Sequence, residues 1–179
     1  MLLPLAGREL DLRKSLGSGG NRTIDEVAPT RNLVSAYITW MILLSSYSAV
    51  SRHAPADVFA RWADPMTWPQ WDSEVRSVDF DGPAVVGAVG KLCPRSGPSS
   101  SFSITALVPN RVFTNTGRLP GAHLIFEHVV DPRADGSEVT VTVSLDGPLA
   151  AVWKIPLRRP MADAARLSTQ GLITTLDGA

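Results

Sequence analysis

The sequence has one cysteine, Cys93, and only three histidines, and these shortages exclude several kinds of site. A single cysteine cannot form a disulfide within the chain. No CxxC pair or Cys/His cluster is present to hold a structural zinc ion, and three scattered histidines do not make a metal site. We therefore expect no metal and no other cofactor, and the unpaired cysteine favours a reducing, cytoplasmic location.

The sequence also lacks an excess of charge of either sign. Lys plus Arg number 17 and Asp plus Glu number 17, so the net charge is zero. Nucleic acids and acidic membrane surfaces are bound through basic patches. We therefore expect no nucleic acid as a partner, and we do not expect a membrane.

The motifs of several large enzyme classes are missing as well. The sequence contains no GxSxG elbow, no Walker loop, no GxGxxG after a strand, no HExxH and no paired-carboxylate motif. Cys93 precedes a proline and has no base near it in the sequence, so an inert thiol is favoured over a nucleophile.

An uncharged run at residues 32–51 has about the length of a membrane-spanning helix, roughly 20 residues. Six serines and threonines dilute it, and its strongly apolar block, residues 40–44, is too short for a span or a typical signal sequence. A linker followed by a first strand is therefore favoured, and a membrane or signal anchor is the alternative.

The chain is expected to hold one domain, because 179 residues fit one domain better than two. Residues 1–31 mix glycine, serine and charged residues without a sustained apolar period. The change of character near Met41 suggests that residues 1–41 are a flexible or non-native extension. The folded domain would then span residues 42–176.

The pattern after the extension predicts an α+β fold. A helix is predicted over residues 54–62, with Pro55 in its first turn, and a short helical turn over residues 66–71. Alternating apolar and polar residues then predict a series of antiparallel strands, the clearest at residues 138–145. They are expected at residues 75–80, 87–92, 102–108, 112–118, 123–130 and 138–145.

The C-terminal part is expected to be a helix over residues 148–176, with a broad apolar stripe. Pro156 and Pro160 should kink this helix, because each removes a backbone hydrogen bond. Strands followed by a helix imply a helix packed on one face of a sheet.

Several short motifs, in this order and spacing, resemble the START-like (SRPBCC) superfamily, and in particular its polyketide cyclase/dehydratase-like branch. They are residues 54–59 (APADVF), 63–65 (ADP), 68–72 (WPQWD), 119–122 (LPGA), 126–128 (FEH), 136–140 (GSEVT) and 147–150 (GPLA). The resemblance implies a helix-grip fold, in which a bent antiparallel sheet wraps around a long C-terminal helix. It also implies a cavity for a small apolar ligand such as a polyketide or lipid, and leaves a homodimer open. The two prolines and the N-terminal extension depart from the family pattern.

Two polar residues are candidates for chemistry. His128 shares a strand face with Phe126, so it should point toward the cavity, as an acid/base, a ligand contact or a hydrogen-bonded core residue. Arg118 ends a strand and could hold an enolate or carboxylate, or lie on the surface. His123 and Glu127 should lie on the opposite face.

Apolar residues on the same faces are the candidates for ligand binding. The resemblance implies two main candidate functions. One is a polyketide cyclase/dehydratase-like enzyme that folds its substrate by confinement, and the other is a non-catalytic carrier or sensor of a lipid or secondary metabolite. A third alternative is a subunit that modulates a partner and has only a vestigial cavity. The candidate ligand-binding residues are Trp71, Phe102, Ile104, Phe126, Val141, Val143, Trp153, Leu157 and Met161.

Overall fold

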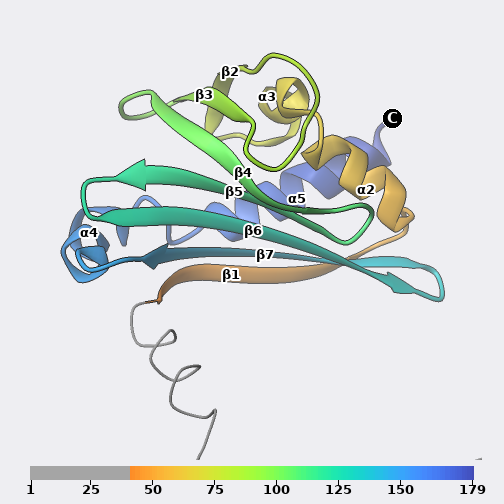
Figure 1. Cartoon of the computed structure of the whole chain (residues 1–179). Helices are drawn as coiled ribbons and strands as arrows, with labels where there is room; N and C mark the ends of the chain where they lie inside the picture. The colour runs from red at the N-terminus through yellow and green to blue at the C-terminus, as the bar shows by residue number, and fades with distance from the viewer. Residues whose placement is uncertain (1–40) are drawn as a thin grey trace, which may run out of the picture. The chain divides into compact units, whose positions relative to one another are not determined.

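The computed structural model describes residues 41–179. The expectations for the N-terminal extension, as a flexible arm or as an anchor, concern residues outside this range. Within it, the fold is α+β, with one antiparallel sheet and a C-terminal helical segment (Figure 1). The predicted helix-grip architecture is confirmed.

Seven strands of the described part form the sheet, in the order β1-β7-β6-β5-β4-β3-β2. β1 pairs with β7, so the first strand lies beside the last one. β2 forms the other edge and pairs with β3. The strands are β1 (Ile42–Ser51), β2 (Val75–Asp79), β3 (Val89–Pro94), β4 (Ser100–Val108), β5 (Val112–Leu119), β6 (Ala122–Arg133) and β7 (Gly136–Asp146).

Alternation along β7 gives the sheet two different faces. Val139, Val141 and Val143 are buried on the face that we call the inner face, which the helices cover. Thr140 and Thr142 point to the other side, the outer face, where their hydroxyls lie 2.8 and 3.1 Å from the hydroxyls of two β1 serines, Ser48 and Ser46. The apolar face and the polar face predicted for this strand are both present.

Three short helical elements follow β1. α2 (Pro55–Trp62) begins with the proline in its first turn and ends before Asp64, as predicted. η1 (Pro65–Thr67) and α3 (Trp68–Trp71) form the predicted short helical turn. The Trp68 indole N–H donates to the carbonyl oxygen of Trp62 at 3.1 Å and joins α3 to the end of α2.

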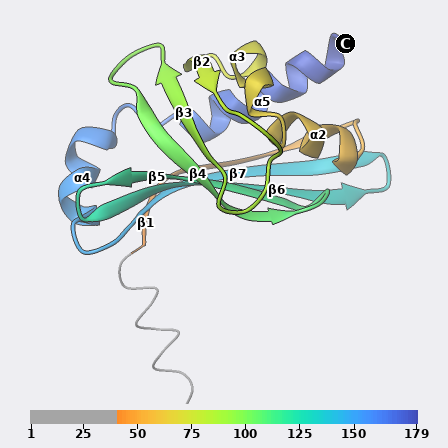
Figure 2. The ribbon, with the colours of Figure 1, turned by 45° about the horizontal axis from the view of Figure 1, so that its top comes forward.

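The C-terminal segment forms two helices where one kinked helix was expected. α4 (Ala150–Leu157) ends after Pro156, and α5 (Ala164–Asp177) begins beyond Pro160. The residues between them form turns, because two prolines four residues apart remove two helical donors. α4 and α2 lie over opposite ends of the sheet (Figure 2).

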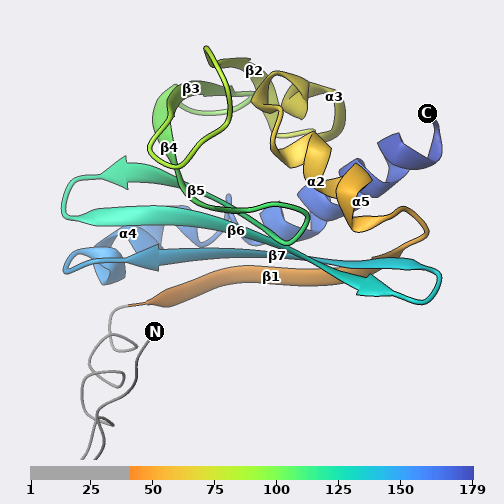
Figure 3. The ribbon, with the colours of Figure 1, turned by 45° about the vertical axis from the view of Figure 1, so that its right-hand side comes forward.

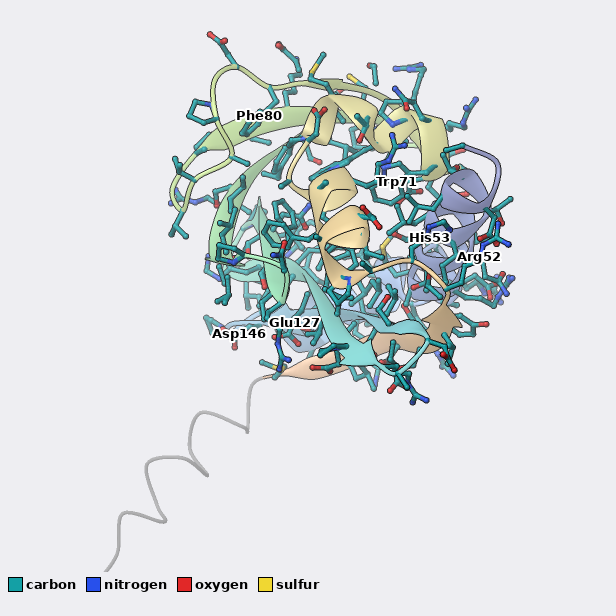
Figure 4. All side chains as sticks on the ribbon, turned by 90° about the vertical axis from the view of Figure 1, so that its right-hand side faces the viewer. Arg52, His53, Trp71, Phe80, Glu127 and Asp146 are labelled. Carbon is teal, nitrogen blue, oxygen red and sulfur yellow. The ribbon has the colours of Figure 1, made fainter. Side chains whose placement is uncertain are left out.

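α5 runs along the sheet from the α4 end toward the α2 end (Figure 3). It approaches α3 closely at Gly171, where an added Cβ would lie 2.0 Å from the carbonyl oxygen of Trp71. Only glycine allows this contact between the backbones. The end of α5 also meets the β1–α2 connection, where Arg52 and His53 each lie 2.9 Å from the Asp177 carboxylate (Figure 4).

The β6–β7 hairpin is longer than the sequence predicted. The strands predicted at residues 123–130 and 138–145 leave residues 131–137 as a hairpin loop, but Asp131 pairs with Glu138 and Arg133 pairs with Gly136. A tight turn at residues 134–135 therefore replaces the loop. Gly136 permits this because it adopts a φ of +128°, a conformation that side-chain-bearing residues rarely adopt.

Candidate functional site

The first feature of the inner face is an apolar cluster at the α2 and α3 end, which we call the filled cluster. All of its core residues are at most 9% exposed. Its aromatic rings pack directly, since the ring centre of Trp68 lies 5.0 Å from that of Phe102 and 6.0 Å from that of Phe113. The core residues are Val58, Phe59, Trp62, Trp68, Trp71, Val75, Val78, Phe102, Ile104, Phe113, Val130, Val139, Leu172 and Leu176.

The second feature is a smaller apolar cluster, which we call the open cluster. Only Val141, Val143 and Ala165 are fully buried in it. Most of its members are large apolar side chains that are only partly buried, although they lie between sheet and helix. These partly buried residues are Leu44, Tyr47, Leu124, Phe126, Met161 and Ala164.

The position of the open cluster follows from the break between α4 and α5. Met161 belongs to the turns between the two helices, and Ala164 and Ala165 begin α5. Turns and alanines offer less bulk than the tryptophans and phenylalanines that cover the other end of the sheet. The sheet residues opposite them, Phe126 and Leu124, therefore keep apolar surface that residues 41–179 do not cover.

His128 lies on the inner face of β6 and is 5% exposed. Its Nδ1 lies 3.1 Å from the carbonyl oxygen of Phe113, so Nδ1 carries the proton and Nε2 has the lone pair. The ring packs against Trp62, with ring centres 5.2 Å apart. Burial lowers the pKa of His128 to about 4, because the charged form is desolvated, and the hydrogen bond to Phe113 opposes this only in part. The imidazole is therefore neutral at pH 7.

The structure does not bring Arg118 and His128 together. Arg118 is exposed and pairs with His123, whereas the inner-face residue beside it on β5 is Gly117. Because strand residues alternate, Arg118 projects from the outer face. His123 and His128 are five residues apart on β6, about 17 Å along the strand. Glu127 also lies on the outer face, as predicted (Figure 4).

The structure divides the candidate ligand-binding residues between the two clusters. Trp71, Phe102 and Ile104 belong to the filled cluster. Trp153 on α4 is half-buried and donates its indole N–H to the carbonyl oxygen of Pro120 at 2.9 Å, and Leu157 is also half-buried. The four candidates that share the open cluster are Phe126, Val141, Val143 and Met161.

Two inner-face residues with polar side chains were not among the predicted site residues. Asn115 on β5 lies directly between Ile104 and Phe126, and Ser45 on β1 lies beside Val143. Asn115 is 7% exposed. The sequence did contain a signal for Asn115. It stands two residues after Phe113 in the same strand, so strand alternation places its amide on the apolar face.

Other titratable groups lie outside both clusters. The Ser99 hydroxyl, 3.0 Å from the Cys93 sulfur, lowers the pKa of that thiol. Burial raises the pKa of Asp72, whose carboxylate accepts the Glu74 backbone N–H at 2.9 Å. Residues 41–179 contain no group of three or more metal-ligating side chains. In the same range no helix is long and apolar enough to cross a membrane.

Three solved structures illustrate how the fold compares with known proteins. The di-domain ARO/CYC protein StfQ from the steffimycin biosynthetic pathway has a TM-score of 0.63 at 10% identity, over 82% of this chain and 55% of that chain. Protein MLL2253 from Mesorhizobium loti has a TM-score of 0.57 at 14% identity, over 78% and 98% of the two chains. Ara h 8.0201 has a TM-score of 0.57 at 16% identity, over 77% and 96%.

These identities are low, so the three structures establish the fold alone. No curated protein matches the chain by sequence. A family model does match, over residues 45–175, and it describes proteins of polyketide cyclase / dehydrase and lipid transport. The match covers β1 to α5, which is nearly all of the described domain. This chain therefore belongs to the polyketide cyclase / dehydrase and lipid transport family.

Proposed function

We propose that this chain binds a small, largely apolar molecule, a polyketide or a lipid, against the open cluster. The observation that carries the proposal is the partial burial of Leu124, Phe126 and Met161, which lie between sheet and helix and still have accessible apolar surface. A ligand would remove that surface from water. Each 100 Å² of apolar surface removed contributes about 2.5 kcal/mol before the costs of association.

The proposal favours binding over catalysis. A general base acts best when its pKa lies near the working pH, and the pKa of His128 is about 4. Its imidazole is also held by Phe113 and packed against Trp62. Arg118, the other candidate for chemistry, projects from the outer face. We therefore assign the ligand contact to the partly buried Phe126 and Met161, with Val141 and Val143 as buried residues of the same cluster, and no catalytic role to Arg118.

A cyclase or dehydratase activity is the second candidate, and one observation favours it. The neutral His128 directs its proton to Phe113 and keeps the Nε2 lone pair, which is the form that accepts a proton from a carbon between two carbonyl groups. The description of the family, and the designation of the structural neighbour StfQ as an ARO/CYC protein, support this candidate. Confinement of a reactive chain would supply most of the rate enhancement.

Binding can be tested by titrating the protein with dodecanoic acid and with 2-naphthol, which represent the lipid and aromatic classes. We expect Phe126→Ala to weaken binding by about tenfold, because it removes one wall of the open cluster. Phe80→Ala is the matched control, since Phe80 is also half-buried but stacks on Phe102 of the filled cluster, with ring centres 6.0 Å apart. Failure of both compounds to bind, or an equal loss in both variants, would contradict the proposal.

The two candidates differ in turnover. An enzyme would convert a poly-β-ketone analogue faster than the uncatalysed reaction, and His128→Gln would remove that acceleration. A carrier would bind the analogue and return it unchanged. The measurement is product formation by mass spectrometry at saturating analogue.

A further inference from the structure

The inner face contains a buried acceptor that has no hydrogen-bond partner within the described part of the chain. The side-chain oxygen of Asn115 has no partner among residues 41–179, although the residue is 7% exposed. A buried polar atom without a partner is unfavourable, and native proteins keep few of them. Rotation of the amide would exchange its oxygen and nitrogen, but the position would still require a polar partner.

The place of Asn115 points to a ligand as that partner. Ile104, its neighbour on β4, belongs to the filled cluster, whereas Phe126, its neighbour on β6, belongs to the open cluster. The Asn115 amide therefore lies on the border between the two clusters. A molecule bound on Phe126 would therefore contact the Asn115 amide with the end that points toward the filled cluster.

Two other buried polar atoms, one on the sheet and one on α2, also lack a hydrogen-bond partner within residues 41–179. The Ser45 hydroxyl, in the same row across the sheet as Asn115, Phe126 and Val143, also lacks a partner within residues 41–179. So does the indole N–H of Trp62, whose ring packs on His128. His128 and Asn115 are diagonal neighbours on adjacent strands, about 7–8 Å apart.

We propose that Asn115 determines the ligand class of this site by accepting a hydrogen bond from a hydroxyl group on an otherwise apolar, ring-sized ligand. The inference rests on the proposed binding function and adds to it a polar group at a defined position. A phenol or alcohol satisfies the buried oxygen, whereas a plain hydrocarbon leaves it without a partner. A ligand with a second hydroxyl group can reach Ser45 on the other side of Phe126.

The test compares three probes on the full chain: 2-naphthol, 2-methoxynaphthalene, which cannot donate a hydrogen bond, and naphthalene. We expect the wild-type protein to bind 2-naphthol about five- to tenfold more tightly than 2-methoxynaphthalene, the effect of one buried hydrogen bond. The dissociation constant of naphthalene divided by that of 2-naphthol should be about five- to tenfold smaller in Asn115→Leu than in the wild-type protein. The melting temperature of the ligand-free variant should rise, because the unpaired oxygen is gone.

Thr116→Val is the matched control, because Thr116 is the next residue on β5, equally buried, but on the outer face and bonded to Thr105 at 2.9 Å. It should leave the ratio at the wild-type value. If wild-type protein binds the three probes equally, or Asn115→Leu keeps the preference, the inference is wrong and the binding function stands. If no probe binds but dodecanoic acid does, the inference is wrong and the binding function stands; if dodecanoic acid also fails to bind, both are wrong. The comparison of probes on wild-type protein decides the question even if Asn115→Leu does not fold.

Discussion

The two apolar clusters lie on the same face of the same sheet, yet they are covered in different ways. In the filled cluster, Trp62, Trp68 and Phe113 leave at most 4% of their surface exposed. In the open cluster, Phe126 and Leu124 remain only partly buried. The difference is the reason why we propose the open cluster, and not the filled cluster, as the ligand site.

The cause lies in the segments that cover the sheet. α2 and α3 supply tryptophans and a phenylalanine, and they pack against the C-terminal half of α5. The other end is covered by the turns between α4 and α5, where Pro160 prevents a continuous helix. This segment therefore contributes Met161 and two alanines to the cluster, and no aromatic side chain.

The largest expected effect is the loss of an aromatic ring from the filled cluster. Phe113 is 0% exposed, so Phe113→Ala should lower the free energy of unfolding by about 3–5 kcal/mol. Phe126→Ala, on the adjacent strand in the open cluster, should lower it by only about 1–2 kcal/mol, because that ring is partly exposed. Urea unfolding measures both, and equal losses would remove the distinction between the clusters.

The next effect is a pH dependence that arises at the border of the filled cluster. The pKa of His128 is lowered from 6.5 to about 4, so the unfolded chain binds a proton at a higher pH than the folded chain does. The free energy of unfolding is therefore highest above pH 6.5, where His128 is neutral in both states. It falls by about 3 kcal/mol as the pH drops toward 4.

His128→Gln should remove this part of the pH dependence. His123→Gln is the matched control, because His123 lies on the same strand but is exposed on the outer face. The free energy of unfolding of His123→Gln should depend on pH in the same way as that of the wild-type protein. An unchanged profile in His128→Gln would show that the pH dependence comes from other groups.

A smaller effect on stability is expected when a larger side chain is introduced into each cluster. Ile104→Phe places a larger ring in the filled cluster, where Ile104 is 1% exposed, and should cost about 1–3 kcal/mol. Leu124→Phe makes a comparable change in the open cluster and should cost less than about 1 kcal/mol, because the side chain has space to occupy. Thermal unfolding compares the two, and an equal cost would mean that the open cluster is as tightly packed as the other.

The smallest effect is expected at Arg118. Because this side chain is exposed on the outer face, Arg118→Ala should change the free energy of unfolding by less than about 0.5 kcal/mol and leave ligand affinity at the wild-type value. Isothermal titration with 2-naphthol checks the affinity. A tenfold loss of affinity for 2-naphthol would show that Arg118 contributes to ligand binding.

The sequence was sufficient to predict the fold but not the division of its interior. Alternation along β7 and the proline at the start of α2 are local signals, and both elements form as they predict. The clusters depend instead on which helix covers which strand. Phe102 and Phe126 have the same residue type and the same alternating strand context, so only the tertiary packing of Trp68 against Phe102 separates them. Asn115 was missed because its neighbours on β4 and β6 follow from the register of the sheet.

The most direct measurement of the central claim is a methyl NMR titration of the protein with 2-naphthol. We predict shift changes at the methyl groups of Leu124 and Met161, which are partly buried in the open cluster. We predict no change at Val58 and Leu172, which are both 0% exposed in the filled cluster. Changes at Val58 and Leu172 with none at Leu124 and Met161 would contradict the assignment of the ligand to the open cluster.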